Sequence, residues 1–229
     1  MAKLILDAHP SVVVVKSLDK YLFAVYDEGY PRKAYRLSAN NIGGNPESYD
    51  VSPERLLIKE ISEEFDPNHP VEKAHVGKVD WASQDDIRFI RNGLLGHIVP
   101  LQDFFVNQPE IIEGGNKPYT AVYSTFYSEV PFFVIQRVLK NLSTGKNIPT
   151  EGLTDVFTLR ELESSPRGEF STAHITAHIL NWKFGSNIPH PRQLTAEPIG
   201  LPRKTYKDYL SDFEYNNENL KKASVADFG

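Results

Sequence analysis

Residues 52–66 decide the fold, and they read Ser-Pro-Glu-Arg-Leu-Leu-Ile-Lys-Glu-Ile-Ser-Glu-Glu-Phe-Asp. Ser52 is a favourable N-cap, and Pro53 suits the first helical position because its missing N–H needs no partner there. Glu54 places an acid in the first turn, as helix starts prefer. The helix should run to about Phe65, because a proline follows two residues later.

This predicted helix has an apolar face and an acidic face. At about 100° per residue its apolar side chains form one stripe, and Glu60, Glu63 and Glu64 occupy the neighbouring sector. Like charges at these spacings repel by about 0.2–0.5 kcal/mol per pair, and a divalent cation between them would remove that repulsion. Hard cations such as Mg²⁺ prefer oxygen ligands, so a metal site is one reading. A solvated acidic surface is the other.

Upstream of the helix, the sequence predicts extended segments and then a glycine pair. Val12–Lys16 and Tyr21–Tyr26 are β-branched and aromatic runs separated by a short turn, which is typical of a hairpin. Lys33–Leu37 is expected to be a third extended piece. Gly43 and Gly44 relax the backbone limits that a Cβ imposes, so another group can approach the main chain closely at this point.

Downstream, helical and period-two patterns alternate along the chain. Strands are predicted at Tyr119–Ser128 and Thr154–Leu159. Helices are predicted, from capping residues and apolar spacing, at Ser83–Gly96, Leu101–Val106, Pro131–Gly145 and Ser171–Phe184. Strands followed by helices in this order predict an α+β fold with a mixed sheet.

Composition limits the class of protein. The chain has 229 residues, a net charge of −5, 40% hydrophobic residues and no cysteine. Disulfides, thiolate zinc sites and cysteine nucleophiles are therefore excluded. The longest apolar runs are far shorter than the ~20 residues that a bilayer requires, and no Lys/Arg block is present for duplex DNA. We expect a cytoplasmic protein with no membrane and no duplex nucleic acid partner.

The segment from Gly43 to Asp66 resembles the Nudix box, whose signature is G-x5-E-x7-R-E-U-x-E-E-x-G-U, with U a bulky aliphatic residue. Glu60, Ile61, Glu63 and Glu64 match the E-U-x-E-E core position by position. The hairpin and glycine pair before the helix also follow the arrangement of that family.

Four positions differ from the signature. Lys59 stands where the family has Arg, and Val51 stands where it has the first Glu. Asp50 can pair with Lys59 if the loop carries a one-residue insertion, which also makes Gly44 the glycine of the box. Asp66 and a proline replace the closing glycine and aliphatic residue.

The resemblance implies a Nudix-like α/β/α sandwich with a mixed β-sheet. Residues 1–190 would form this domain, with a helical insertion at about 67–118 and a C-terminal extension at 191–229. The insertion would either shape the substrate pocket or form the interface of a homodimer.

The resemblance also implies an activity: metal-dependent hydrolysis of the pyrophosphate bond in a nucleoside diphosphate linked to another group. Glu60, Glu63 and Glu64, with the Gly44 carbonyl, would hold Mg²⁺ or Mn²⁺, and Lys59 would brace the loop. The partner would be a small-molecule nucleotide. The alternative is a catalytically impaired Nudix-like module that binds nucleotides or regulates.

Other polar and aromatic residues suggest weaker candidates. His174 and His178 have the i,i+4 spacing of a zinc site but lack the glutamate of the H-E-x-x-H motif. Glu151 and Glu161 flank the later strand, where they are either a further catalytic base or solvated acids. Nucleobase-stacking candidates, should they point into a cleft, are Tyr21, Tyr26 and Phe126.

Overall fold

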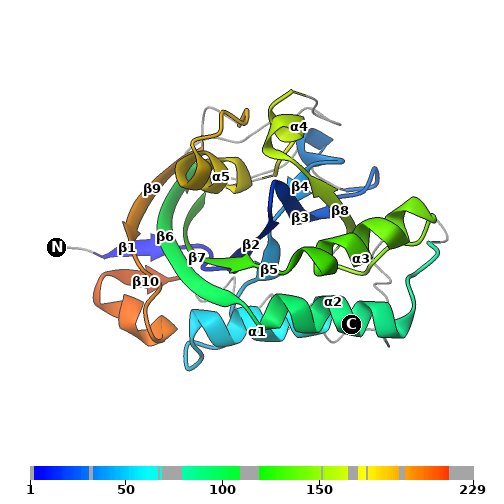
Figure 1. The fold of residues 1–229 in the computed structure, drawn as a ribbon. Helices are drawn as coiled ribbons and strands as arrows, with labels where there is room; N and C mark the ends of the chain where they lie inside the picture. The colour runs from blue at the N-terminus through cyan, green and yellow to red at the C-terminus, as the bar shows by residue number, and fades with distance from the viewer. Residues whose placement is uncertain are drawn as a thin grey trace.

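A mixed β-sheet organises the chain (Figure 1). The computed structural model describes residues 3–30, 33–66, 68, 79–108, 119–150, 152–164, 170–173, 175–190 and 194–216. Within these ranges the sheet has eight strands, ordered β4-β3-β2-β7-β6-β9, with β5 pairing to β2 and β8 to β3. They are β2 (Ser11–Ser17), β3 (Lys20–Val25), β4 (Ala39–Asn40), β5 (Ile42–Gly44), β6 (Ile98–Gln108), β7 (Tyr119–Glu129), β8 (Leu153–Phe157) and β9 (Thr195–Gly200).

Strand direction makes the sheet mixed. β2 and β7 run parallel, whereas the other pairs in this sheet are antiparallel. A separate two-stranded sheet joins the ends of the described chain, because β1 (Leu4–Leu6) pairs in parallel with β10 (Phe213–Tyr215). The predicted α+β class with a mixed sheet is therefore confirmed.

Helices cover both faces of the sheet (Figure 1). α1 (Pro53–Glu64), α2 (Gln84–Leu95) and α3 (Phe132–Ser143) pack on one face. α4 (Leu159–Ser164) and α5 (Thr176–Phe184) pack on the other. Two short 3₁₀ helices are η1 (Lys33–Tyr35) and η2 (Tyr206–Ser211).

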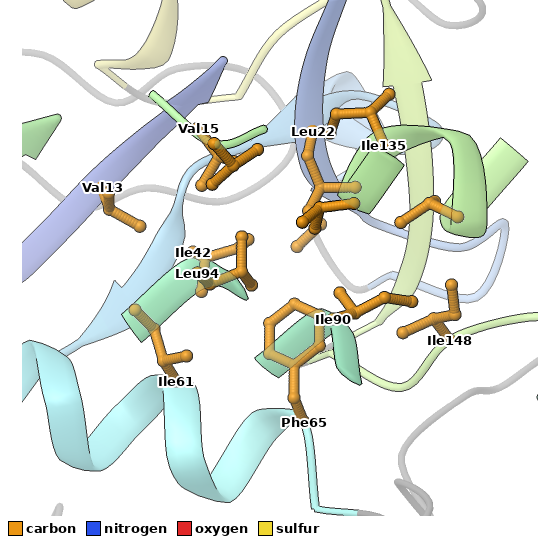
Figure 2. Packing of buried hydrophobic residues seen from close by; sticks show 14 of the residues in the cluster. Val13, Val15, Leu22, Ile42, Ile61, Phe65, Ile90, Leu94, Ile135 and Ile148 are labelled. Carbon is orange, nitrogen blue, oxygen red and sulfur yellow. The ribbon is translucent and has the colours of Figure 1, made fainter. Parts of the chain in front are cut away.

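The alternation of side chains along β2 explains the two cores. Val13 and Val15 point toward α1, α2 and α3 (Figure 2), whereas Val12 and Val14 point toward α5. A strand that is covered on both faces needs an uninterrupted apolar run, and residues 12–15 supply it. The sequence Val-Val-Val-Val therefore fixes β2 at the centre of the molecule.

The helix that leads to the acidic residues starts as predicted. The Ser52 Oγ accepts a hydrogen bond from the Arg55 backbone N–H at 3.1 Å, which caps α1. Leu57, Ile61 and Phe65 are buried against the sheet and against α2. Figure 2 shows Ile61 and Phe65 in this packing. Packing of this apolar face fixes the direction of the neighbouring acidic face.

Two predicted elements are wrong. The predicted helix at Leu101–Val106 is part of the long strand β6, which lies between β7 and β9. The predicted extended piece at Lys33–Leu37 is instead the helix η1 followed by a turn, in which Leu37 has a φ of 61°. Residues 98–108 and 195–200, expected in an insertion and an extension, are strands of the main sheet.

No helix in the described part of the chain is long and apolar enough to cross a bilayer.

Candidate metal centre

Two of the three predicted metal-binding glutamates lie against the glycine pair. The Glu64 Oε1 accepts a hydrogen bond from the Gly43 backbone N–H at 3.3 Å. The Glu60 carboxylate lies so close to Gly44 that a Cβ added there would be 2.4 Å from the Glu60 Oε2. Residues four apart share one helical face, so α1 directs both half-buried carboxylates at β5.

The two glycines have different neighbours. Gly43 has a φ of 142°, and a Cβ there would lie 2.0 Å from the backbone carbonyl oxygen of Ser11 on β2. Gly44 instead leaves room for the Glu60 side chain. The pair therefore lets β5 approach both the neighbouring strand and α1.

The third glutamate has a different partner. Glu63 is exposed, and its Oε1 lies 3.6 Å from the Nζ of Lys59. The same Nζ donates a hydrogen bond to the Glu47 Oε1 at 2.8 Å. The hydrogen bond to Glu47, reinforced by the charge of Glu63, raises the pKa of Lys59 above its usual range. Lys59 thus stays charged and links α1 to the loop before it.

The predicted pair between Lys59 and Asp50 is wrong. Asp50 forms an ion pair with Lys207 instead, because the loop turns its side chain toward the C-terminal segment. The acid that meets Lys59 is Glu47, which sequence reasoning missed. The available signal was its position three residues after Gly44, in the loop that must return to the helix.

The donor set suits a hard cation. Glu60 supplies carboxylate oxygens beside Gly44, and Glu64 supplies them beside the backbone of Gly43. Mg²⁺ is usually bound by one or two carboxylates together with waters. Within the described residues, no three or more histidine, aspartate or glutamate side chains are grouped so that they could hold an ion together. Two of the predicted acids are brought together, and Glu63 is turned toward Lys59.

His178, one of the two histidine candidates, lies on the opposite face of the sheet. The rings of His178 on α5 and His190 are 3.8 Å apart between centroids. Burial, with the nearby His190, lowers the pKa of His178 to about 4, so it is neutral at pH 7. His174 and Glu151 lie outside the described residues.

Glu161 has a local structural role. Its Oε2 accepts hydrogen bonds from the backbone N–H and the hydroxyl of Thr158, at 2.6 and 2.8 Å. Thr158 precedes α4, so the carboxylate lies at the start of that helix, where negative charge is favoured.

The aromatic side chains considered for nucleobase stacking are buried. Tyr21, Tyr26 and Phe126 are 3%, 7% and 1% exposed, and each packs inside a hydrophobic cluster. Tyr21 and Phe126 therefore cannot stack on a ligand from solvent, whereas Tyr26 lines the cavity described below. Tyr123 and Tyr127 also pack against the α5 side.

A cavity of about 540 Å³ opens where β3 and β8 meet the end of α3. Its polar lining is mainly acidic, and the acids are Asp27, Glu28, Asp80 and Asp155. A negatively charged wall disfavours phosphate unless a cation lies between them.

Comparison with known proteins gives no match, either to a protein family or to a curated protein.

Proposed function

We propose that this protein is a Nudix-like, metal-dependent hydrolase that cleaves the pyrophosphate bond of a nucleoside diphosphate linked to another group. One observation carries the proposal: Glu60 and Glu64, the first and last acids of the E-U-x-E-E motif, both meet the Gly43–Gly44 backbone. A surface helix with a merely acidic face has no need of a glycine, here Gly44, that leaves room for one of its carboxylates.

The residues of the site have separable roles. Glu60 and Glu64, with the Gly44 carbonyl, would hold Mg²⁺ or Mn²⁺. The ion, when bound, neutralises the pyrophosphate and lowers the pKa of a bound water. A glutamate of the set Glu60, Glu63 and Glu64 would accept the proton of the attacking water. Lys59 would hold the loop by its contact with Glu47.

Phosphate release tests the activity. The purified chain is incubated with Mg²⁺ or Mn²⁺ and ADP-ribose, NAD(H), dinucleoside polyphosphates, nucleotide sugars or nucleoside triphosphates. Products of the first four classes, whose phosphates are capped until cleavage, are then treated with phosphatase, those of the triphosphates with inorganic pyrophosphatase, and phosphate is measured. We expect release from at least one compound, and a loss of about 10²-fold or more in Glu60→Gln and Glu64→Gln. Glu54→Gln, an exposed acid on the same helix, is the control and should keep the activity. Equal activity in all three variants would contradict the assignment.

A nucleotide-binding module without turnover is the second candidate. The observation that favours it is the position of Glu63, which lies beside Lys59 rather than being grouped with the other two acids. Thermal unfolding with Mn²⁺ and each nucleotide separates the two functions, because a ligand that binds only the folded state raises the melting temperature. Stabilisation without phosphate release supports the module, whereas release supports the hydrolase.

A further inference from the structure

The loop between β5 and α1 is held from outside by the C-terminal segment. We name residues 45–52 the entry loop and residues 205–216 the C-terminal strap. The Val51 carbonyl accepts a hydrogen bond from the Tyr206 backbone N–H at 3.2 Å. The neighbouring Asp50 carboxylate forms the ion pair with Lys207 described above. Two adjacent residues of the loop therefore meet two adjacent residues of the strap.

A third loop residue contacts the other end of the strap. The rings of Tyr49 and Tyr215 stack with centroids 4.3 Å apart and an interplanar angle of 24°. Three consecutive residues of the entry loop are thus engaged by a backbone hydrogen bond, an ion pair and a ring stack. A segment that only covered the surface of the loop would not need a separate contact with each of these three residues.

The strap also reaches the sheet beside the glycine pair. The hydroxyl of Tyr206 hydrogen-bonds the Ser11 Oγ at 2.8 Å, and both residues are buried. Ser11 is the residue opposite Gly44 in the pairing of β2 with β5. One tyrosine of the strap therefore contacts the loop through its backbone and the strand beneath the site through its side chain.

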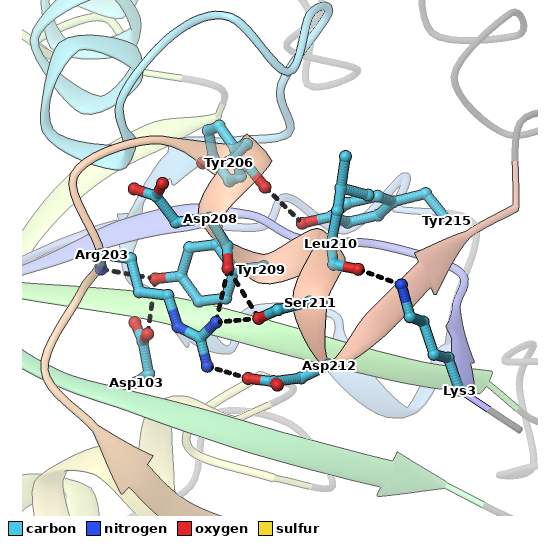
Figure 3. Close-up of polar contacts among 10 residues, drawn as sticks. All are labelled: Lys3, Asp103, Arg203, Tyr206, Asp208, Tyr209, Leu210, Ser211, Asp212 and Tyr215. Atoms are coloured by element: carbon cyan, nitrogen blue, oxygen red, sulfur yellow. Dashed lines mark hydrogen bonds and ion pairs between the residues drawn. The ribbon is translucent and has the colours of Figure 1, made fainter. Parts of the chain in front are cut away.

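Buried polar contacts fix the strap in one position (Figure 3). The Tyr209 hydroxyl donates to the Asp103 Oδ2 at 2.5 Å and accepts from the Arg203 backbone N–H at 2.8 Å. On the other side, the two nitrogens of His9 lie 2.8 Å from the Tyr215 hydroxyl and 3.1 Å from the Ser124 Oγ. Buried polar groups without partners are costly, so any shift of the strap that breaks these bonds is disfavoured.

We infer that the C-terminal strap is the positioning element of the candidate metal centre: Tyr206, Lys207 and Tyr215 hold the entry loop so that the glycine pair and α1 keep Glu60 and Glu64 together. This inference rests on the proposed function. Lys59 and Glu47 link the loop to α1, and the strap holds the loop from the opposite side. These strap residues are positioning residues, since the contacts that carry the inference are with the loop and with Ser11.

The test compares Tyr206→Phe combined with Lys207→Met against Lys204→Met. The first variant removes one buried hydroxyl bond and the Asp50 ion pair, whereas Lys204 is an exposed cation immediately before the strap. Amide hydrogen exchange of residues 47–52 and Mn²⁺ binding by calorimetry are both measured. We expect exchange to become about two- to tenfold faster and Mn²⁺ to bind about two- to tenfold more weakly, as the loss of about one hydrogen bond implies. The control should match the wild type.

Two outcomes would overturn the inference: unchanged exchange in the entry loop, or faster exchange with unchanged Mn²⁺ affinity. In the second case the metal centre stands and only the role of the strap fails. Absence of Mn²⁺ binding to the wild type would instead contradict the proposed function, and the exchange rates alone would then show whether the strap holds the loop. Restoring Tyr at position 206 in the double variant should recover part of the protection.

Discussion

Adding a methyl group at Gly44 should weaken metal binding without changing the stability of the fold. In Gly44→Ala the new Cβ would lie 2.4 Å from the Glu60 Oε2, and the carboxylate, which ends a flexible side chain, must move away. We expect Mn²⁺ affinity to fall about tenfold or more, because a displaced ligand no longer reaches the ion. Urea unfolding should change little, since no backbone atom has to shift. Calorimetry with Mn²⁺ and urea titration provide the two measurements.

The matched substitution at the neighbouring Gly43 should instead lower the stability of the fold. Gly43→Ala places a Cβ 2.0 Å from the Ser11 carbonyl oxygen at a φ of 142°. Such backbone strain costs about 1–3 kcal/mol, so the unfolding midpoint should drop. If both alanine variants lose stability equally, the carboxylate of Glu60 is held more rigidly than the contact with Gly44 suggests.

The buried carboxyl beneath the strap should make stability depend on pH. Burial raises the pKa of Asp103 from 3.8 to about 6, against the opposing effects of the Tyr209 hydrogen bond, Ser124 and the charge of Arg203. Burial, and the charge of Arg203, lower the pKa of nearby His9 to about 3, so it stays neutral. The folded protein binds the Asp103 proton more tightly than the unfolded chain. Its contribution to stability is full below about pH 4 and is lost as the pH rises through about 6.

Asp103→Asn tests this expectation, because it keeps an acceptor for Tyr209 and removes the titration. Relative to the variant, the wild type should lose up to about 3 kcal/mol between pH 4 and pH 7.5. Buried His9, whose contribution to stability rises with pH over this range, acts equally in both proteins and cancels in the comparison. Urea unfolding of both proteins at the two pH values gives the comparison. A constant difference between them would show that Asp103 does not titrate in this range.

At the residue scale, the sequence predicts the acids of the helix better than their partners. Glu60 and Glu64 follow from a local motif whose spacing sets one helical face. The partner of Lys59 depends on the path of an irregular loop, and there Glu47, rather than the nearer Asp50, meets the lysine. The sequence of an irregular loop has no periodic pattern from which its path could be predicted.

At the element scale, a double-mutant cycle on Lys59 and Glu47 measures the contact between the loop and α1. Both side chains are about half exposed, so we expect a coupling of about 0.2–1 kcal/mol in the free energy of unfolding. Lys59→Met should nevertheless reduce phosphate release severalfold, because small displacements of a site impair catalysis. Lys20→Met is the control, since Lys20 lies at the distant β2–β3 turn. Equal losses of phosphate release in both lysine variants would show that Lys59 has no specific role in the site.

Helices with local start and stop signals can be predicted from the sequence, whereas strands that depend on pairing with distant strands cannot. α1 has its N-cap and proline, and its predicted boundaries agree with the structure. In β6, Leu101, Phe104 and Phe105 have helix-like spacing, yet the segment is a strand because β7 and β9 pair with both of its edges. Tertiary pairing overrides a local pattern of this kind.

At the scale of the whole molecule, removing the strap should destabilise far more than its own segment. A chain ending at Lys204 loses Tyr209 and Phe213, which are buried against Leu6 and Val122. Deleting one buried aromatic side chain costs about 3–5 kcal/mol, so the total approaches the stability of an ordinary domain. We expect circular dichroism to show a strongly lowered melting temperature relative to the full chain. An unchanged melting temperature would show that the strap is only peripheral.

The strap is also the part of the molecule least accessible to sequence reasoning. Tyr206 and Tyr209 stand in a polar, proline-containing stretch that predicts at most one amphipathic turn. Their partners, Ser11 and Asp103, are about 195 and 106 residues away. Contacts over such separations leave no periodic signal, although buried tyrosines commonly need a hydrogen-bond partner.

The parallel pairing of β1 with β10 has a mechanical consequence. A pull on the amino end of β1 and the carboxyl end of β10 acts along the two strands in opposite directions. The load then falls at the same time on the three residue pairs from Leu4–Phe213 to Leu6–Tyr215, and on the hydrogen bond from the Asn216 N–H to the Leu6 carbonyl. Bonds loaded together in shear resist force better than bonds opened one after another. Tension between the two ends of the described chain would therefore have to break the pairing of β1 with β10 before it reached the eight-stranded sheet.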